Sequence, residues 1–167
     1  MRCLVCINHS GSAIMNRSIS IPEWHRLSKE EAAPPVRIQL NGVSMFPLVR
    51  MNLDYVTIAP IRDVPEAGDL ILFMNGNTGR YVVHRLWKTE GGRVLIWGDN
   101  CPAPDGWFQM EEVLGKVVLI ERGKRTIHPD PKKGLRWASI WHRIRPGYYF
   151  AWRIKEAISR RIKKVKV

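Results

Sequence analysis

The pattern of apolar and polar residues changes twice along the chain, near residue 36 and near residue 131. Between these points lie short runs rich in β-branched and aromatic residues, separated by turns that contain glycine. These runs cover residues 36–42, 54–61, 68–75, 80–90, 93–100 and 112–128. Because no long helical pattern separates them, they predict a mainly β fold, either an antiparallel β-sheet or a small barrel.

A short helix is expected before the sheet. Ser20 can cap its first turn, Pro22 suits an early helical position, and Glu23 places an acid near the helix N-terminus. Pro34 and Pro35 are then expected to end it. The chain therefore divides into an N-terminal irregular segment with this helix, a β domain and a helical tail, covering residues 1–35, 36–130 and 131–167.

The tail shows two helical patterns. In the first, Trp137, Trp141 and Ile144 recur at helical spacing, and Pro146–Gly147 is expected to break the helix. In the second, which starts near Tyr148, apolar residues fall on one side and arginines and lysines lie elsewhere. This second pattern predicts a basic amphipathic helix with aromatic residues at its start.

The positive charge is concentrated in the tail. The chain of 167 residues has 27 Lys and Arg and 15 Asp and Glu, a net charge of +12. From Lys132 onward there are 12 Lys and Arg against one acid, Glu156, so the tail carries +11 and the remainder +1. A nearly neutral body argues against a catalytic domain built around nucleic acid, and the tail indicates an anionic partner.

Three interpretations of the tail remain open. It is a solvated or partly packed helix, it lies on an anionic membrane surface, or it contacts nucleic acid. The mixture of aromatic and basic side chains in residues 131–167 favours the membrane surface, and nucleic acid is the least favoured partner.

Composition and cysteine content indicate the compartment. With 45% hydrophobic and 25% charged residues, the chain resembles a soluble domain, and its N-terminal sequence lacks the apolar stretch of a secretory signal. We therefore expect a cytoplasmic location, with the tail able to hold the protein at the inner face of the membrane. Cys3, Cys6 and Cys101 fit a reducing compartment, and a lone C-x-x-C predicts ordinary thiols. No metal or cofactor is expected.

The segment "NGVSMFPLVR" contains the candidate nucleophile, Ser44, which follows a strand and opens a turn. A serine needs a base to accept its proton, and His84 lies within the predicted strand 80–90. Asp99 and Asp105 follow in the sequence, so Ser, His and Asp occur in an order that permits a catalytic triad. Taken alone, a histidine inside a strand is more often a structural residue and Gly-Asp-Asn is a turn signal, so these residues by themselves favour the structural interpretation over a triad.

Five segments in order resemble the motifs of the signal peptidase I and LexA-like peptidase superfamily, over about residues 36–122. They are "GVSMFPL", "AGDLILF", "YVVHRL", "GDN" with a following aspartate, and "LGKVVLI". Where bacterial-type signal peptidases and LexA-like repressors have lysine as the base, this chain has His84, which resembles the endoplasmic-reticulum and archaeal signal peptidases. In that type an aspartate six residues after the Gly-Asp-Asn aspartate completes the site. The resemblance thus implies Asp105 as the third residue, with Asp99 as second choice.

The resemblance implies the fold of that superfamily and a serine endopeptidase that needs no cofactor and cleaves a precursor or leader peptide. The backbone N–H of Ser44 would bind the oxyanion. Gly42 stands where many signal peptidases have Ser or Thr, so that side-chain donor is missing. The chain also begins without the membrane anchor of true signal peptidases and looks more like short, anchorless bacterial relatives. The alternative is a catalytically inactive member that acts as a peptide-binding or regulatory module.

Two further residues are candidates for contact with a substrate. Met45 either packs beneath the nucleophile or contacts the substrate, and packing is favoured. Trp107 follows Asp105 closely and is a candidate for lining a substrate cleft.

Overall fold

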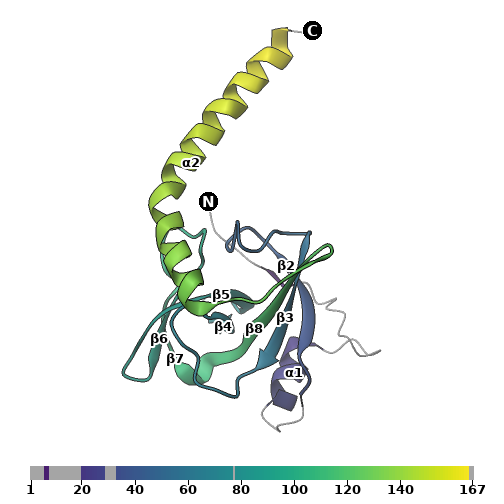
Figure 1. The fold of residues 1–167 in the computed structure, drawn as a ribbon, viewed down its shortest axis with the longest axis vertical. Helices are drawn as coiled ribbons and strands as arrows, with labels where there is room; N and C mark the ends of the chain where they lie inside the picture. The colour runs from purple at the N-terminus through teal and green to yellow at the C-terminus, as the bar shows by residue number, and fades with distance from the viewer. Residues whose placement is uncertain (1–5, 8–19, 29–32, 77, 166–167) are drawn as a thin grey trace.

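The computed structural model describes residues 6–7, 20–28, 33–76 and 78–165. For residues 6–7 and 150–165 it describes the backbone alone. The chain is mainly β, with a short helix near the N-terminus and a long helix at the C-terminus (Figure 1). The strands are β1 (Cys6–Ile7), β2 (Val36–Asn41), β3 (Asp54–Pro60), β4 (Leu70–Asn75), β5 (Arg80–Glu90), β6 (Arg93–Trp97), β7 (Gly106–Gln109), β8 (Val113–Arg122) and β9 (Arg125–Ile127). A 3-10 turn, η1 (Met110–Glu112), separates β7 from β8.

The strands form one antiparallel sheet in the order β1-β2-β3-β8-β4-β5-β6-β7, with β9 paired to β8. This confirms the predicted antiparallel sheet. The sheet is open and does not close into a barrel, so that alternative does not hold. Residues 6–7 also pair with β2, where the sequence predicted irregular structure. The rest of the segment 1–19, including Cys3, lies outside the described residues.

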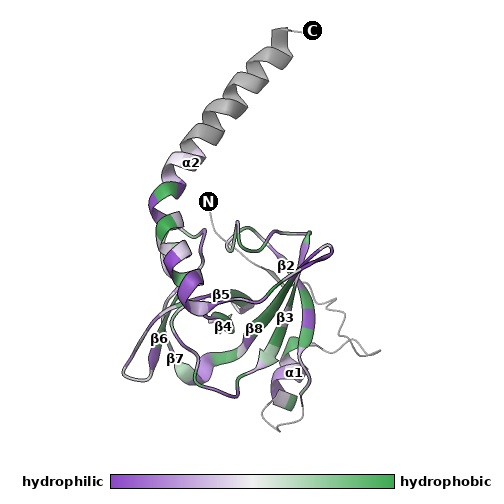
Figure 2. Ribbon diagram, viewed as in Figure 1, coloured by the Kyte–Doolittle hydropathy of each residue, from purple (hydrophilic) through white to green (hydrophobic). Residues whose placement is uncertain are grey.

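The hydrophobic core follows from the strand patterns. In β2 the alternating residues Val36, Ile38 and Leu40 are buried, as expected for a strand with one face toward the core. The first four residues of β4 are all fully buried, because this central strand is covered on both faces. Hydrophobic residues dominate the central strands in Figure 2.

The predicted N-terminal helix is present as α1 (Ile21–Ser28). The backbone N–H of Glu23 donates to the hydroxyl of Ser20 at 3.3 Å, which is the hydrogen bond that a capping serine accepts. Trp24 anchors the helix, since its side chain is fully buried and its indole N–H donates to the carbonyl of Pro34 at 2.7 Å. Its apolar area is therefore removed from water without leaving the N–H unpaired.

The tail differs from the prediction in one respect. It forms a single helix, α2 (Pro131–Val165), which includes Pro146, so the expected break at Pro146–Gly147 is wrong. Proline removes one helical hydrogen bond, but contacts on both sides of it hold the segment against the body. Arg145 donates to the carbonyl of Cys101 at 2.5 Å, and the Tyr149 hydroxyl bonds to the Asn100 side chain at 2.9 Å.

His142 packs the inner side of α2 against the sheet. Its ring lies 4.1 Å from that of Trp97 and 5.0 Å from that of Trp87, measured between centroids. Burial, and then the nearby charge of Arg145, lower the pKa of His142, so the imidazole is neutral at neutral pH. Within the described residues, no helix is long and apolar enough to span a membrane.

Candidate active site

Ser44, His84 and Asp105 form a continuous hydrogen-bonded chain. Nε2 of His84 lies 2.8 Å from Oγ of Ser44, and Nδ1 lies 2.6 Å from Oδ2 of Asp105. The two contacts use opposite nitrogens of one imidazole, which is the arrangement of a nucleophile, a base and an orienting acid. The three residues come from the loop after β2, from β5 and from the residue before β7.

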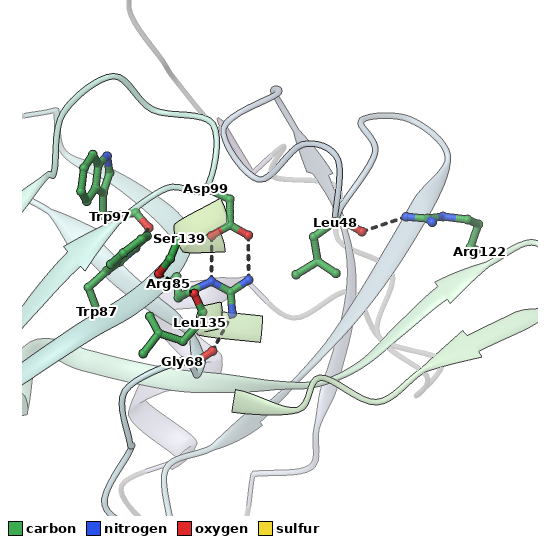
Figure 3. Close-up of polar contacts among 9 residues, drawn as sticks. All are labelled: Leu48, Gly68, Arg85, Trp87, Trp97, Asp99, Arg122, Leu135 and Ser139. Atoms are coloured by element: carbon green, nitrogen blue, oxygen red, sulfur yellow. Dashed lines mark hydrogen bonds and ion pairs between the residues drawn. The ribbon is translucent and has the colours of Figure 1, made fainter. Parts of the chain in front are cut away.

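The loop that carries Ser44 is fixed at its far end by an ion pair. Asp54, at the start of β3, is buried and lies opposite Arg122 in the sheet register, with a contact of 2.6 Å. The same guanidinium donates to the carbonyl of Leu48 in the loop at 2.8 Å (Figure 3). Asp54 in turn accepts from the backbone N–H of Arg50 at 2.9 Å. The ion pair thus anchors the loop to two central strands.

This ion pair also sets the charge state of Asp54. Burial alone would raise the pKa of this carboxyl, but the hydrogen bonds from Arg122 and from the Arg50 backbone outweigh it and lower the pKa below 3.8. Its carboxylate in turn raises the pKa of Arg122. Asp54 is therefore ionised wherever the loop is folded at neutral pH.

The near end of the loop is tied to the turn after β6. The backbone N–H of Asn100 donates to the carbonyl of Ser44 at 2.6 Å, and its side-chain amide donates to the carbonyl of Val43 at 2.9 Å. The turn itself closes through a bond from the Cys101 N–H to the Gly98 carbonyl at 2.9 Å. The loop that carries Ser44 and this turn are therefore joined by two hydrogen bonds.

His84 lies in β5 with its ring close to the backbone of Gly98. A Cβ atom at Gly98 would lie 2.9 Å from Nε2 of His84 and 2.7 Å from Sγ of Cys101, closer than packed atoms approach. The ring also faces Phe73, at 6.1 Å between centroids. The Gly-Asp-Asn sequence therefore supplies space for the imidazole as well as a turn.

Asp99 is bonded to Arg85 instead of His84. Its two carboxylate oxygens accept from Nε and Nη2 of Arg85, both at 2.7 Å, and both side chains are buried (Figure 3). Nη1 of Arg85 donates to the carbonyl of Gly68, also at 2.7 Å. A Cβ atom at Gly134 of α2 would lie 2.5 Å from Nη1, so α2 begins directly against this guanidinium. Of the two candidate aspartates, the structure places Asp105 on the histidine and Asp99 on the arginine.

The site is covered. Ser44 is 0% exposed and His84 is 1% exposed. Helix α2 contacts the loop that carries Ser44 and the turn after β6. The ring of Trp141 packs against that of Phe46, with centroids 6.1 Å apart, and the hydroxyl of Tyr149 hydrogen-bonds to the side chain of Asn100. A molecule from solution can therefore reach Oγ of Ser44 only if some of the residues packed around it move.

Ser44 and Gly42 are the two residues that the sequence places at a possible oxyanion position. Within the described part of the chain, the backbone N–H of Ser44 makes no hydrogen bond and is available as a donor. Gly42 has a φ of 119°, a conformation that residues with a side chain rarely adopt, which explains why no Ser or Thr stands there. Gly42 thus shapes the turn and offers no side-chain donor.

The two candidate cleft residues, Met45 and Trp107, differ in exposure. Met45 is 2% exposed and belongs to the hydrophobic core, which is consistent with a packing role, and its contact with a substrate stays a prediction. Trp107, on β7, is 41% exposed, and the cations of Lys88 and Arg93 lie 5.9 and 5.6 Å from its ring. Its role as a cleft residue stays a prediction.

The described residues contain no group of three His, Cys, Asp or Glu side chains placed to hold a metal ion. Cys3 lies outside the described residues, the side chain of Cys6 is not described, and the side chain of Cys101 is buried.

Sequence reasoning missed two residues that position the site, Arg85 and Asn100. Arg85 follows His84 directly, and an arginine inside a buried strand pattern signals that a buried acid must lie opposite. Asn100 belongs to a Gly-Asp-Asn turn motif in the sequence, and in the structure its side-chain amide also donates to the carbonyl of Val43 in the Ser44 loop. Only the fold brings these residues together with residues 43–44.

Comparison with known proteins adds no identification: no protein-family model matches the chain, and no curated protein matches it.

Proposed function

We propose that the protein is a serine endopeptidase that cleaves a precursor or leader peptide, with Ser44 as nucleophile. The observation that carries this proposal is the chain of contacts of 2.8 and 2.6 Å from Ser44 through His84 to Asp105. Such a chain lets a base accept the serine proton while an acid stabilises the charged imidazole. The order of the motifs, which resembles the signal peptidase I and LexA-like superfamily, supports the same function.

In the proposed reaction, Oγ of Ser44 attacks the peptide carbonyl while Nε2 of His84 accepts the hydroxyl proton. Asp105 accepts from Nδ1 and stabilises the imidazolium. The backbone N–H of Ser44 donates to the oxyanion of the tetrahedral intermediate. His84 then protonates the leaving amine, and water hydrolyses the acyl-enzyme by the same steps in reverse. With one side-chain donor fewer at the oxyanion, we expect a slow or specialised peptidase.

A second candidate function is a peptide-binding or regulatory module without catalysis. The observation in its favour is the burial of Ser44 and His84, which have 0% and 1% exposure. A module of this kind would keep the triad geometry without ever admitting a substrate carbonyl to Oγ.

The two functions are separated by incubating the full-length protein with a diverse synthetic peptide library and reading new termini by mass spectrometry. The peptidase gives a consistent set of cleavages that Ser44→Ala and His84→Ala abolish. Val64→Ser is a matched control, since Val64 is 81% exposed and lies outside the site. Cleavages that persist in both site variants would remove the assignment, and peptide capture without cleavage would favour the module.

A further inference from the structure

Helix α2 exposes a stripe of large apolar side chains. Trp137, Ile140, Ile144 and Tyr148 are spaced by three or four residues, so they follow one side of the helix. Their exposed fractions are 45%, 50%, 54% and 46%. We call these four residues the α2 stripe. A contiguous exposed apolar strip of this kind marks a surface that meets an apolar partner.

The stripe faces outward because the adjacent side of α2 is fixed to the body. Ala138 and Trp141 are 0% and 6% exposed, and His142 packs between Trp87 and Trp97. The first half of α2 runs beside the sheet with hydrophobic and hydrophilic residues interspersed (Figure 2). The stripe is therefore not the face by which the helix docks on its own domain.

Exposed cations flank the stripe. Lys132, Lys133, Arg136 and Arg143 are exposed, and residues 131–149 contain no acidic residue. Arg136 and Arg143 form no salt bridge with any residue that the structure describes. The surface around the apolar strip is therefore positive and would attract anionic groups.

We infer that the α2 stripe docks the protein on the surface of an anionic lipid membrane. Aromatic and aliphatic side chains along one side of a helix enter the headgroup and acyl boundary, while the flanking Lys and Arg pair with lipid phosphates. The helix would lie in the plane of the membrane, because it is not apolar enough to cross one.

The chemistry of the surface selects a membrane over nucleic acid or an acidic protein. A nucleic acid would satisfy the cations but leaves Ile140 and Ile144 without an apolar environment. A membrane supplies negative charge and an apolar phase together. The stripe also continues onto the nucleophile loop, because Tyr148 contacts Phe46, with ring centroids 6.5 Å apart, and Val43 is 50% exposed.

The test is sedimentation of the full-length protein with phosphatidylcholine vesicles prepared with or without phosphatidylglycerol. We expect binding to the vesicles that contain phosphatidylglycerol and little binding to phosphatidylcholine alone. Ile140→Ser/Ile144→Ser should weaken binding at least about tenfold, since two aliphatic side chains no longer enter the apolar phase. Arg136→Gln/Arg143→Gln should weaken it several-fold and reduce its dependence on salt.

Controls separate this inference from the proposed peptidase function and from general attraction by a basic tail. Ser44→Ala and Val64→Ser should bind the vesicles like the wild type. Circular dichroism checks that the Ile140→Ser/Ile144→Ser variant retains its fold. Wild-type binding by that variant would show that charge alone attracts the protein, which overturns the inference. Retention of duplex DNA without vesicle binding would overturn it as well.

Discussion

Asp105 lies 2.6 Å from Nδ1 of His84, on the side of the imidazole that faces away from Ser44. The carboxylate therefore fixes which nitrogen carries the proton and leaves Nε2 free to accept one from the serine. Asp105→Asn should lower the rate of peptide cleavage at least about a hundredfold with little change in thermal stability, since the acid no longer stabilises an imidazolium. Steady-state kinetics and thermal denaturation measure the two effects. Unchanged kinetics would remove Asp105 from the site.

Asp99 should show the reverse pattern. Its side chain is 0% exposed and holds Arg85 at two points, so Asp99→Asn leaves a buried guanidinium without its counter-charge. The expected loss is about 3–5 kcal/mol in the free energy of unfolding, measured by urea denaturation. A stable Asp99→Asn protein that has lost its activity would instead place Asp99 at the reaction.

Asn100 should support catalysis without touching the reacting atoms. Asn100→Ala removes the hydrogen bond to the carbonyl of Val43, so we expect the nucleophile loop to shift. A displacement of about 1 Å at a nucleophile lowers the rate by up to about a hundredfold. We expect kcat to fall while KM changes little. Tyr149→Phe, which removes only the link from α2, is the comparison and should have a smaller effect. Equal effects would assign the support to the helix.

Acid should release the far end of the same loop. The pKa of Asp54 is lowered in the folded protein, so the folded state holds this proton less tightly than the unfolded chain. Its stabilisation is present above pH of about 4 and is lost as the pH falls through the lowered folded value. Asp54→Asn should flatten the acid limb of the unfolding free energy and lower stability at pH 7 by about 1–3 kcal/mol.

A matched control for Asp54 is Asp63→Asn, an exposed aspartate in the loop after β3. It should leave both the stability at pH 7 and the shape of the acid limb unchanged. If Asp54→Asn and Asp63→Asn have the same pH dependence, the ion pair with Arg122 does not govern acid unfolding.

Much of the fold could be predicted from the sequence because its signals are local. The strands 80–90 and 93–97 join at two glycines, and the first helix starts at a capping serine. The expected break at Pro146 failed because contacts distant in sequence, from Arg145 and Tyr149 to the turn after β6, hold the helix through the proline. The low helix propensity of proline is a local property, and at Pro146 the tertiary contacts of α2 outweigh it.

The candidate site was predictable in part. Ser44 and His84 stood out through residue type and order, whereas the choice of Asp105 over Asp99 depended on family resemblance until the hydrogen bonds placed each aspartate. The burial of Ser44 had no local signal, since it arises from the packing around the nucleophile loop, to which α2 contributes.

The most direct test of the central claim is labelling of the native protein with a fluorophosphonate, which reacts with an activated serine hydroxyl. Mass spectrometry of the digested protein then locates the adduct. We predict a single adduct on Ser44, absent in Ser44→Ala and strongly slowed in His84→Ala. An adduct on Ser44 that forms equally fast without His84, or no adduct on Ser44 in the wild type, would contradict a Ser-His nucleophile.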